Sequence, residues 1–379
     1  MLSIILLGLT SLLTDISTEM VYPLLPLYLV YKLGSGPQIL GFIEGIAESL
    51  ASLLKVFSGY FSDKIKRRLP FAIFGYLSST IGKFFLYLST NWLYVFIARV
   101  IDRFGKGIRT APRDALIAES IEANKKGMAF GLHRALDTLG ASLGVLFAYF
   151  LLKNSLNNFK NIFLFSLIPA ILGIVFLFFV KEKKEKIKII KEKPSLKWNL
   201  LNKKLKLFLI FTFIFTLGNS SNHFLLLRAK TQGVEIDKII LLYLFYNLIY
   251  TLTSYPAASL SDKIGRKRIL ILGYFFYGLV YLGFALNHSV NNFWFLFGLY
   301  GFYIGFTEGT EKALIADISP SDLKASALGL HATLVGIGLF PASLFAGIIW
   351  KFFGPELVFY LGGFLGILSS IGLYFILKD

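Results

Sequence analysis

Apolar residues fill the chain in successive runs of about 20 positions, and each run is interrupted by Gly, Pro, Asn or a cluster of charges. A helix needs about 20 apolar residues to cross a bilayer, so the pattern predicts an all-α membrane protein. We predict twelve transmembrane helices. Their spans are 2–31, 37–62, 69–89, 92–118, 126–152, 159–180, 205–229, 236–261, 268–287, 291–316, 323–350 and 355–377.

Three short blocks recur in the second half of the chain and indicate an internal repeat. GYFSDKI at 59–65 is echoed by ASLSDKI at 258–264, which begins 199 residues later. ALIAE at 115–119 returns as ALIAD at 313–317, and GLH at 131–133 returns at 329–331, both after 198 residues. We therefore predict two pseudo-symmetric six-helix bundles, 1–180 and 205–379, joined by the basic linker 181–204.

Composition supports a membrane protein, because 55% of the residues are hydrophobic, 16% are charged and the mean hydropathy is +0.67. The net charge of +17 would suggest nucleic-acid binding in a soluble protein. Here, however, Lys and Arg are concentrated in the loops 63–68, 119–126, 181–204, 262–268 and 317–324. Basic loops mark the cytoplasmic side. We therefore expect a multi-pass protein of the cytoplasmic (inner) membrane with both termini in the cytoplasm, and no nucleic-acid partner.

Other features limit the possible functions. The chain has no cysteine, which excludes disulfides and thiolate metal sites, and we expect no metal or cofactor. The N-terminal run lacks a basic n-region, so we interpret it as the first span and not as a removed signal peptide. No Walker loop or nucleophile–base constellation is evident, so we expect neither an enzyme nor direct use of ATP. We expect a monomer whose partners are the lipid bilayer and a small solute.

The chain resembles the major facilitator superfamily in its loop motifs. Gly59, Asp63, Lys64, Arg67 and Arg68 match the pattern G-x-x-x-D-R-x-G-R-R, with Lys66 in place of the second Gly, and the second copy has Asp262, Gly265 and Arg266. Arg103, Lys106, Gly107 and Ala111 are similar to the fourth-helix pattern R-x-x-Q-G-x-x-x-A. The resemblance covers the whole chain, points to an uncharacterised prokaryotic subgroup and implies transport by alternating access. The family's fifth-helix antiporter pattern has a Gly-Pro pair that is missing between Gly140 and Gly144.

The predicted helix 92–118 carries a stripe of charged residues on one face, including Arg99, Arg103 and Lys106. A basic residue at the centre of a lipid-facing helix costs about 2.5–3.5 kcal/mol, so this face must meet other helices or a water-filled path lined with acids. We expect the acids of the first two spans at matching depth, either as structural ion pairs or as groups that exchange partners. The candidate substrate and coupling residues are Asp15, Glu19, Glu44, Glu48, Arg99, Arg103, Lys106, Arg134, Asp137, Asn219, Asn222, His223 and Asn247.

The two acidic loop residues, Asp63 and Asp262, predict a gate at the cytoplasmic side. The resemblance implies that Asp63 caps a neighbouring helix and that Arg67 pairs with Glu119 or Asp114. The candidate gate residues are Gly59, Asp63, Arg67, Arg113, Asp114, Glu119, Asp262 and Arg266.

We predict a secondary active transporter that moves a small solute by alternating access. Proton coupling is the default hypothesis, because carboxylates that lie together in the membrane can hold a proton. The bases of 92–118 favour an organic anion or metabolite as substrate. Aromatic residues and the acids of 2–31 favour a cationic or amphipathic drug exported by an efflux pump. A transporter-like sensor or a lipid-moving protein is a third alternative.

Overall fold

The computed structural model of the protein describes residues 2–65, 67–121, 126–154, 159–182, 201–319 and 324–376. Within these ranges the chain is helical between short connections and has no strand. Each of the twelve predicted spans corresponds to helical structure whose ends lie within a few residues of the prediction. Among the described residues, nine helices are long and apolar enough to cross a membrane, while α3, α5 and α12 fall short of that composition. Residues 183–200 of the predicted linker lie outside the described part.

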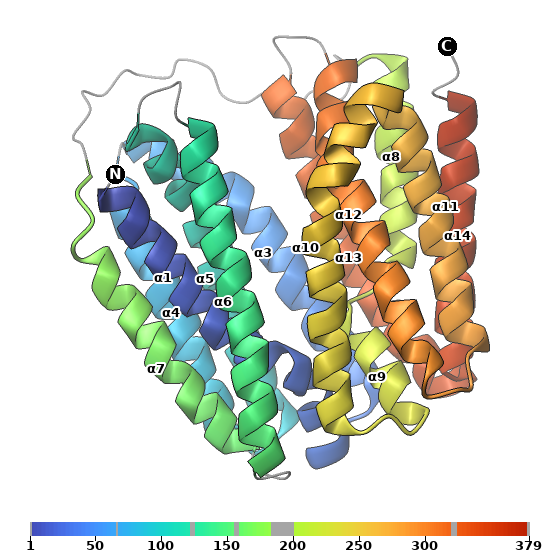
Figure 1. Ribbon diagram of the computed structural model, residues 1–379, viewed down its shortest axis with the longest axis horizontal. Helices are drawn as coiled ribbons and strands as arrows, with labels where there is room; N and C mark the ends of the chain where they lie inside the picture. Colours follow the sequence, from blue (N-terminus) through green and yellow to red (C-terminus); the bar gives the residue numbers. More distant parts are fainter. Residues whose placement is uncertain are drawn as a thin grey trace. The chain divides into compact units, whose positions relative to one another are not determined.

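The chain divides into two compact units, shown together in Figure 1. One unit comprises Met1–Ser35 with Ile46–Lys191, and the other comprises Gly36–Gly45 with Glu192–Asp379. The sequence assigned residues 36–45 to the first half. In the structure these first turns of α3 group with the second unit.

The first unit is built from α1 to α7. Its elements are α1 (Leu2–Val21), η1 (Tyr22–Leu24), α2 (Leu25–Leu27), η2 (Tyr28–Lys32), most of α3 (Pro37–Ile65), α4 (Leu69–Tyr87), α5 (Trp92–Glu119), α6 (Lys126–Asn154) and α7 (Phe159–Leu177). The first predicted span changes from α-helix to a 3₁₀ turn at Pro23 and to a π turn after Pro26, because neither proline can donate a backbone hydrogen bond.

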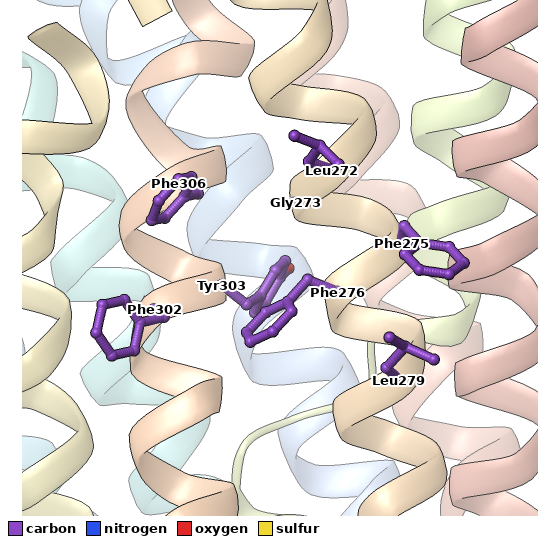
Figure 2. A pocket seen from close by; sticks show the side chains of 8 residues that line it. All are labelled: Leu272, Gly273, Phe275, Phe276, Leu279, Phe302, Tyr303 and Phe306. Carbon is purple, nitrogen blue, oxygen red and sulfur yellow. The ribbon is translucent and has the colours of Figure 1, made fainter. Parts of the chain in front are cut away.

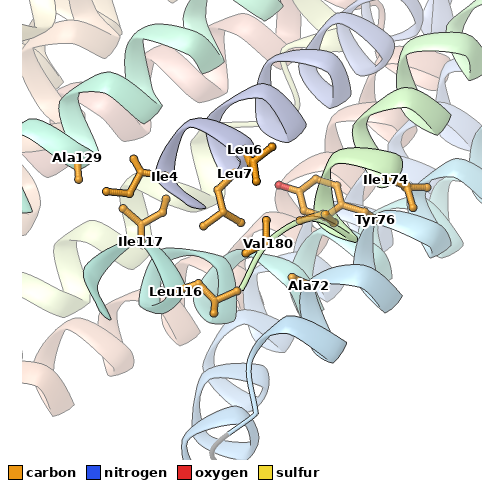
Figure 3. Close-up of a cluster of buried hydrophobic side chains, with 11 residues drawn as sticks. Ile4, Leu6, Leu7, Ala72, Tyr76, Leu116, Ile117, Ala129, Ile174 and Val180 are labelled. Atoms are coloured by element: carbon orange, nitrogen blue, oxygen red, sulfur yellow. The ribbon is translucent and has the colours of Figure 1, made fainter. Parts of the chain in front are cut away.

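An apolar cluster holds one end of this unit together (Figure 3). Leu7 of α1, Tyr76 of α4 and Ile117 of α5 are members, so the cluster joins α1 to the consecutive helices α4 and α5. α4 and α5 approach so closely that a Cβ on Gly105 would lie 2.3 Å from the Gly75 carbonyl oxygen. Glycine at 105 therefore allows α5 to pack against α4 along its charged part.

The second unit is built from α8 to α14. Its helices are α8 (Lys203–Gly218), α9 (His223–Thr231), α10 (Ile236–Ile264), α11 (Arg266–Leu286), α12 (Asn292–Ile318), α13 (Lys324–Phe353) and α14 (Pro355–Ile376). Within this unit α12 packs against α10 and α11, and α14 packs against α11 and α8.

The predicted continuous helix 205–229 is broken, and this corrects the sequence interpretation. α8 ends at Gly218 and α9 begins at His223, with a non-helical segment between them. The segment reads Asn-Ser-Ser-Asn, and such side chains compete for backbone hydrogen bonds. The Ser221 hydroxyl accepts a hydrogen bond from the His223 amide at 3.4 Å, and the Tyr277 hydroxyl donates to the Gly218 carbonyl at 2.8 Å. These bonds satisfy polar groups that the break leaves without helical partners.

Candidate functional site

The charged stripe of α5 lies in the interior of the first unit. Arg99, Asp102, Arg103 and Arg109 are all buried. The Glu48 carboxylate of α3 lies 3.2 Å from the Arg103 guanidinium and 3.8 Å from that of Arg99. Asp102 adds a contact of 3.4 Å to Arg99 from one turn away. Buried ions persist only when they are paired. Glu48, Arg99, Asp102 and Arg103 form such a network.

The aromatic and hydroxyl groups around α5 complete its polar environment. The Tyr22 ring faces both guanidinium groups, with its centroid 5.9 Å from Arg99 and 5.8 Å from Arg103. Lys83 of α4 donates to the Thr18 hydroxyl at 3.0 Å. Lys83, Arg99 and Tyr22 help to line a cavity of about 20 Å³, which has room for about one water molecule.

Glu44 does not share this position with Glu48, although the sequence led us to expect it there. It belongs to the part of α3 that groups with the second unit, where its carboxylate lies 3.1 Å from Nδ1 of His223. Both side chains are fully buried. Glu44 and Glu48 are one turn of α3 apart, yet Glu44 contacts a residue of the second unit and Glu48 contacts residues of the first.

Two carboxyl groups of the first unit lie in direct contact. Asp15 of α1 and Asp137 of α6 are within hydrogen-bond reach of each other. Ser11 donates a hydrogen bond to Asp137, and the Arg134 guanidinium lies 3.9 Å from it. Lys106 of α5 and Glu19 of α1 lie within electrostatic range of Asp15. The structure thus brings together five candidate residues from three helices: Asp15, Glu19, Lys106, Arg134 and Asp137.

Each unit carries one three-residue salt-bridge cluster at matching positions of the repeat. In the first unit, Arg68 lies 3.0 Å from Asp63 and 2.5 Å from Glu119. In the second unit, Arg266 lies 3.1 Å from Asp262 and 2.9 Å from Asp317. Glu119 and Asp317 occupy equivalent places in the repeated ALIAE and ALIAD blocks. The repeat therefore reproduces a spatial arrangement as well as a sequence.

One detail of the predicted gate is wrong. Arg68, and not the exposed Arg67, forms the described pair with Glu119, because α3 ends at Ile65 and Arg68 is the N-cap of α4. The α4 N-terminus is capped by Glu182, which accepts hydrogen bonds from the amides of Arg68 and Leu69 at 2.5 and 3.4 Å.

The other gate candidates are placed on α3 and α5. Arg113 binds its neighbour Asp114 at 2.8 Å and donates to the Ser11 hydroxyl at 3.3 Å. A Cβ on Gly59 would lie 3.3 Å from Ala111 of α5. Through Ser11, which also binds Asp137, Arg113 is connected to the acid pair.

The break between α8 and α9 presents amide side chains to a group of tyrosines. Asn222 donates to the Tyr246 hydroxyl at 3.3 Å and accepts from the Tyr300 hydroxyl at 2.7 Å. Asn219 donates to the Tyr303 hydroxyl at 3.5 Å. The second unit therefore offers hydroxyl and amide groups where the first unit offers charges.

Asn247, also predicted as a site residue, donates to the Tyr243 carbonyl of its own helix at 2.9 Å. This bond gives the Asn247 amide a local structural partner.

Sequence reasoning missed one buried cation. Arg228 lies near the end of the predicted span 205–229 and was not among the candidate site residues, but it is only 1% exposed in the structure. It lies 2.7 Å from Glu356 and donates to the carbonyls of Phe284, Ala285 and Asn287 at 3.1, 3.1 and 3.3 Å. The sequence gives little indication of this burial, because a base near the end of a predicted span usually lies at the membrane surface and sets the orientation of the helix.

An apolar groove lies between α11 and α12 and shares Tyr303 with the amide and tyrosine groups described above (Figure 2). Its volume is about 320 Å³, and its rim residues Leu272, Phe275 and Phe302 are exposed. The rings of Phe276 and Tyr303 lie between the two helices. Since no charged residue lines it, this groove suits contact with lipid chains better than recognition of a polar solute.

Comparison with known proteins gives consistent results. The chain matches the model of the Major Facilitator Superfamily over residues 7–227 and 207–379. It is 41% identical over 382 residues to an uncharacterized MFS-type transporter of Methanocaldococcus jannaschii, a match that covers 99% of this chain and 94% of the relative. It is 27% identical over 376 residues to the multi-drug resistance efflux pump PmrA of Streptococcus pneumoniae, covering 94% and 86%.

A solved structure, that of the nucleoside transporter NupG, is similar with a TM-score of 0.82 at 13% identity, and the match covers 100% of both chains. At that identity the likeness establishes the fold alone.

Proposed function

Because the chain belongs to the major facilitator superfamily, we propose that it is a proton-coupled secondary active transporter that moves a small solute across the cytoplasmic membrane by alternating access. The bundles 1–180 and 205–379 would be the moving parts, joined by the linker 181–204. The distribution of basic loops supports cytoplasmic termini. The Arg68 and Arg266 clusters would form and break at the cytoplasmic gate during the cycle.

The contact between Asp15 and Asp137 carries the proposal of proton coupling. Two carboxyl groups can share a hydrogen bond only if one of them holds a proton. Arg113 lies within electrostatic range of Asp137, which also accepts a hydrogen bond from Ser11, and both interactions favour the charged form of Asp137. The proton would therefore reside on Asp15. Loss of this proton would leave a carboxylate beside Lys106, and the resulting attraction would draw Lys106 from Glu48 toward α1.

An organic anion is the substrate class that the charges of the first unit favour. Lys83, Arg99, Arg103 and Arg109 are buried bases, and two acids, Glu48 and Asp102, each engage Arg99 and Arg103. An anionic group on the substrate would compete with Glu48 for Arg99 and Arg103. That exchange would link substrate binding to the same helix that responds to the proton.

Efflux of amphipathic compounds is a second candidate, favoured by the tyrosines around the α8–α9 break. Tyr246, Tyr300 and Tyr303 combine apolar rings with hydroxyl groups, which suits large, weakly polar solutes. Two relatives that the chain covers over most of their length are named as multidrug resistance proteins.

Transport by the purified chain in proteoliposomes tests these proposals. A labelled panel of organic anions, nucleosides, peptides and cationic dyes is offered with and without an imposed pH gradient. We expect accumulation that follows the gradient, and loss of this dependence in Asp15→Asn and Asp137→Asn but not in the control Glu235→Gln, whose carboxylate is exposed. Gradient-driven transport at the wild-type rate in both aspartate variants would refute the coupling scheme. Arg103→Gln should abolish transport of anions and spare that of cationic dyes.

A further inference from the structure

The second unit contains a buried cluster of ionisable groups to which no role has been assigned above. Glu311 of α12 lies 3.5 Å from Nε2 of His331 on α13, and it accepts a hydrogen bond from the Tyr274 hydroxyl of α11 at 2.7 Å. The side chains of Glu311 and His331 are 17% and 10% exposed, and Tyr274 is buried. Three helices thus contribute an acid, a base and a hydroxyl donor to one point in the interior.

The internal repeat provides a comparison for this cluster. The residues 198 positions earlier are Tyr76, Arg113 and His133, so the tyrosine and the histidine are retained. The position between them is a base in the first unit and an acid in the second. Arg113 stays protonated at any physiological pH. A carboxylate at this position can gain and lose a proton.

From this geometry we propose that Glu311 and His331 form a proton-binding site of the second unit, with Tyr274 as its fixed hydrogen-bond donor. The Glu311 carboxylate faces Nε2 of His331, so a proton placed between them would meet an acceptor on each side. Tyr274 and Tyr303 are the other titratable groups that face Glu311. Glu308, one turn away, is instead exposed and engages Lys312 and Tyr250.

The site is linked to the break between α8 and α9. The Tyr274 ring stacks on Phe215 of α8, with centroids 3.8 Å apart and planes 9° from parallel. Phe215 also contacts Tyr277, whose hydroxyl holds the Gly218 carbonyl at the end of α8. Protonation of Glu311 would weaken the acceptor that fixes Tyr274. The change would reach the end of α8 through two packed rings.

Proton binding here does not depend on the acid pair of the first unit, and only its use in transport rests on the proposed function. The experiment therefore measures protonation directly. Purified full-length protein in detergent is titrated from about pH 5 to 8, and infrared difference spectra follow the carboxyl and imidazole bands. The variants are Glu311→Gln, His331→Gln and Tyr274→Phe. Glu308→Gln is the matched control on the same helix, and Asp15→Asn removes the acid pair of the first unit.

We expect the wild-type protein to show a carboxyl–imidazole transition that is lost in Glu311→Gln. His331→Gln and Tyr274→Phe should each move its midpoint, because each removes a direct partner of the carboxylate. Glu308→Gln and Asp15→Asn should leave the transition unchanged. A transition that survives Glu311→Gln, or that disappears in Glu308→Gln, would overturn the proposal. If Glu311→Gln fails to fold, the other two variants decide. A transition midpoint that is the same in His331→Gln and Tyr274→Phe as in the wild type would then overturn the proposal.

Discussion

Replacing Arg228 by Gln tests whether the second unit depends on one buried cation. The Arg228 guanidinium binds Glu356 and three carbonyl oxygens at the end of α11, so it joins α9, α11 and α14. Removing one partner from a buried ion pair costs about 3–5 kcal/mol. Glu356 is 40% exposed and can regain water, so we expect the lower end of this range, about 3 kcal/mol.

Thermal unfolding of the purified protein, followed by intrinsic fluorescence, measures this effect. For a cooperative unit of about 150–250 residues, 1 kcal/mol corresponds to about 2–4 °C in Tm, so Arg228→Gln should lower the Tm by about 6–12 °C. Arg228→Lys should restore only part of this loss, because a single ammonium cannot reproduce the planar donors of the guanidinium.

The control is Lys238→Gln, which breaks the exposed pair between Lys238 and Glu235 in the same unit. Exposed pairs contribute about 0–1 kcal/mol, so its Tm should stay within about 2 °C of the wild type. The reasoning would be refuted if Arg228→Gln unfolded at the wild-type temperature, or if the two substitutions lowered the Tm equally.

Three further substitutions test packing, pairing and gating. Gly105→Leu should lower the Tm by about 4–8 °C, because the new Cβ would meet the Gly75 carbonyl of α4 and overpacking costs about 2 kcal/mol. The control Gly131→Ala should leave the Tm unchanged, because a Cβ at 131 meets nothing within 4 Å. Glu48→Gln should lower the Tm by about 4–8 °C, since two buried guanidinium groups lose one of their two shared acids, at a cost of about 2 kcal/mol; an unchanged Tm would contradict the pairing. Arg266→Gln should slow transport about fivefold or more while shifting the Tm by under about 2 °C, and equal transport rates would argue against a gate.

The helices and the family were predictable from sequence, because length and hydropathy are local properties. Runs of apolar residues located the helices to within a few residues, and the repeated loop motifs identified the superfamily. The break after Gly218 was less predictable. The residues that cause it, Asn219 to Asn222, were recognised as polar candidates, but the tyrosine that holds the Gly218 carbonyl is 59 residues away along the chain.

Pairing among the charges required the tertiary structure. Helical spacing placed Glu44 and Glu48 on one face of α3, but only the packing around α3 could show that one contacts His223 and the other contacts Arg103. In the same way, Arg68 replaced Arg67 because α3 ends at Ile65 and thereby turns one basic side chain toward Glu119.

The sequence by itself determined where the apolar spans lie, which loops carry positive charge and that the fold is built from a repeat. These properties depend on the preference of each segment for lipid or water, which is set by its own residues. The tertiary structure decided which acids meet which bases, that Arg228 is buried, and that Glu311 and His331 meet in the second unit. The physical reason is that an ion pair depends on the approach of two helices to within a few ångströms, and that approach is fixed by packing far from the pair itself.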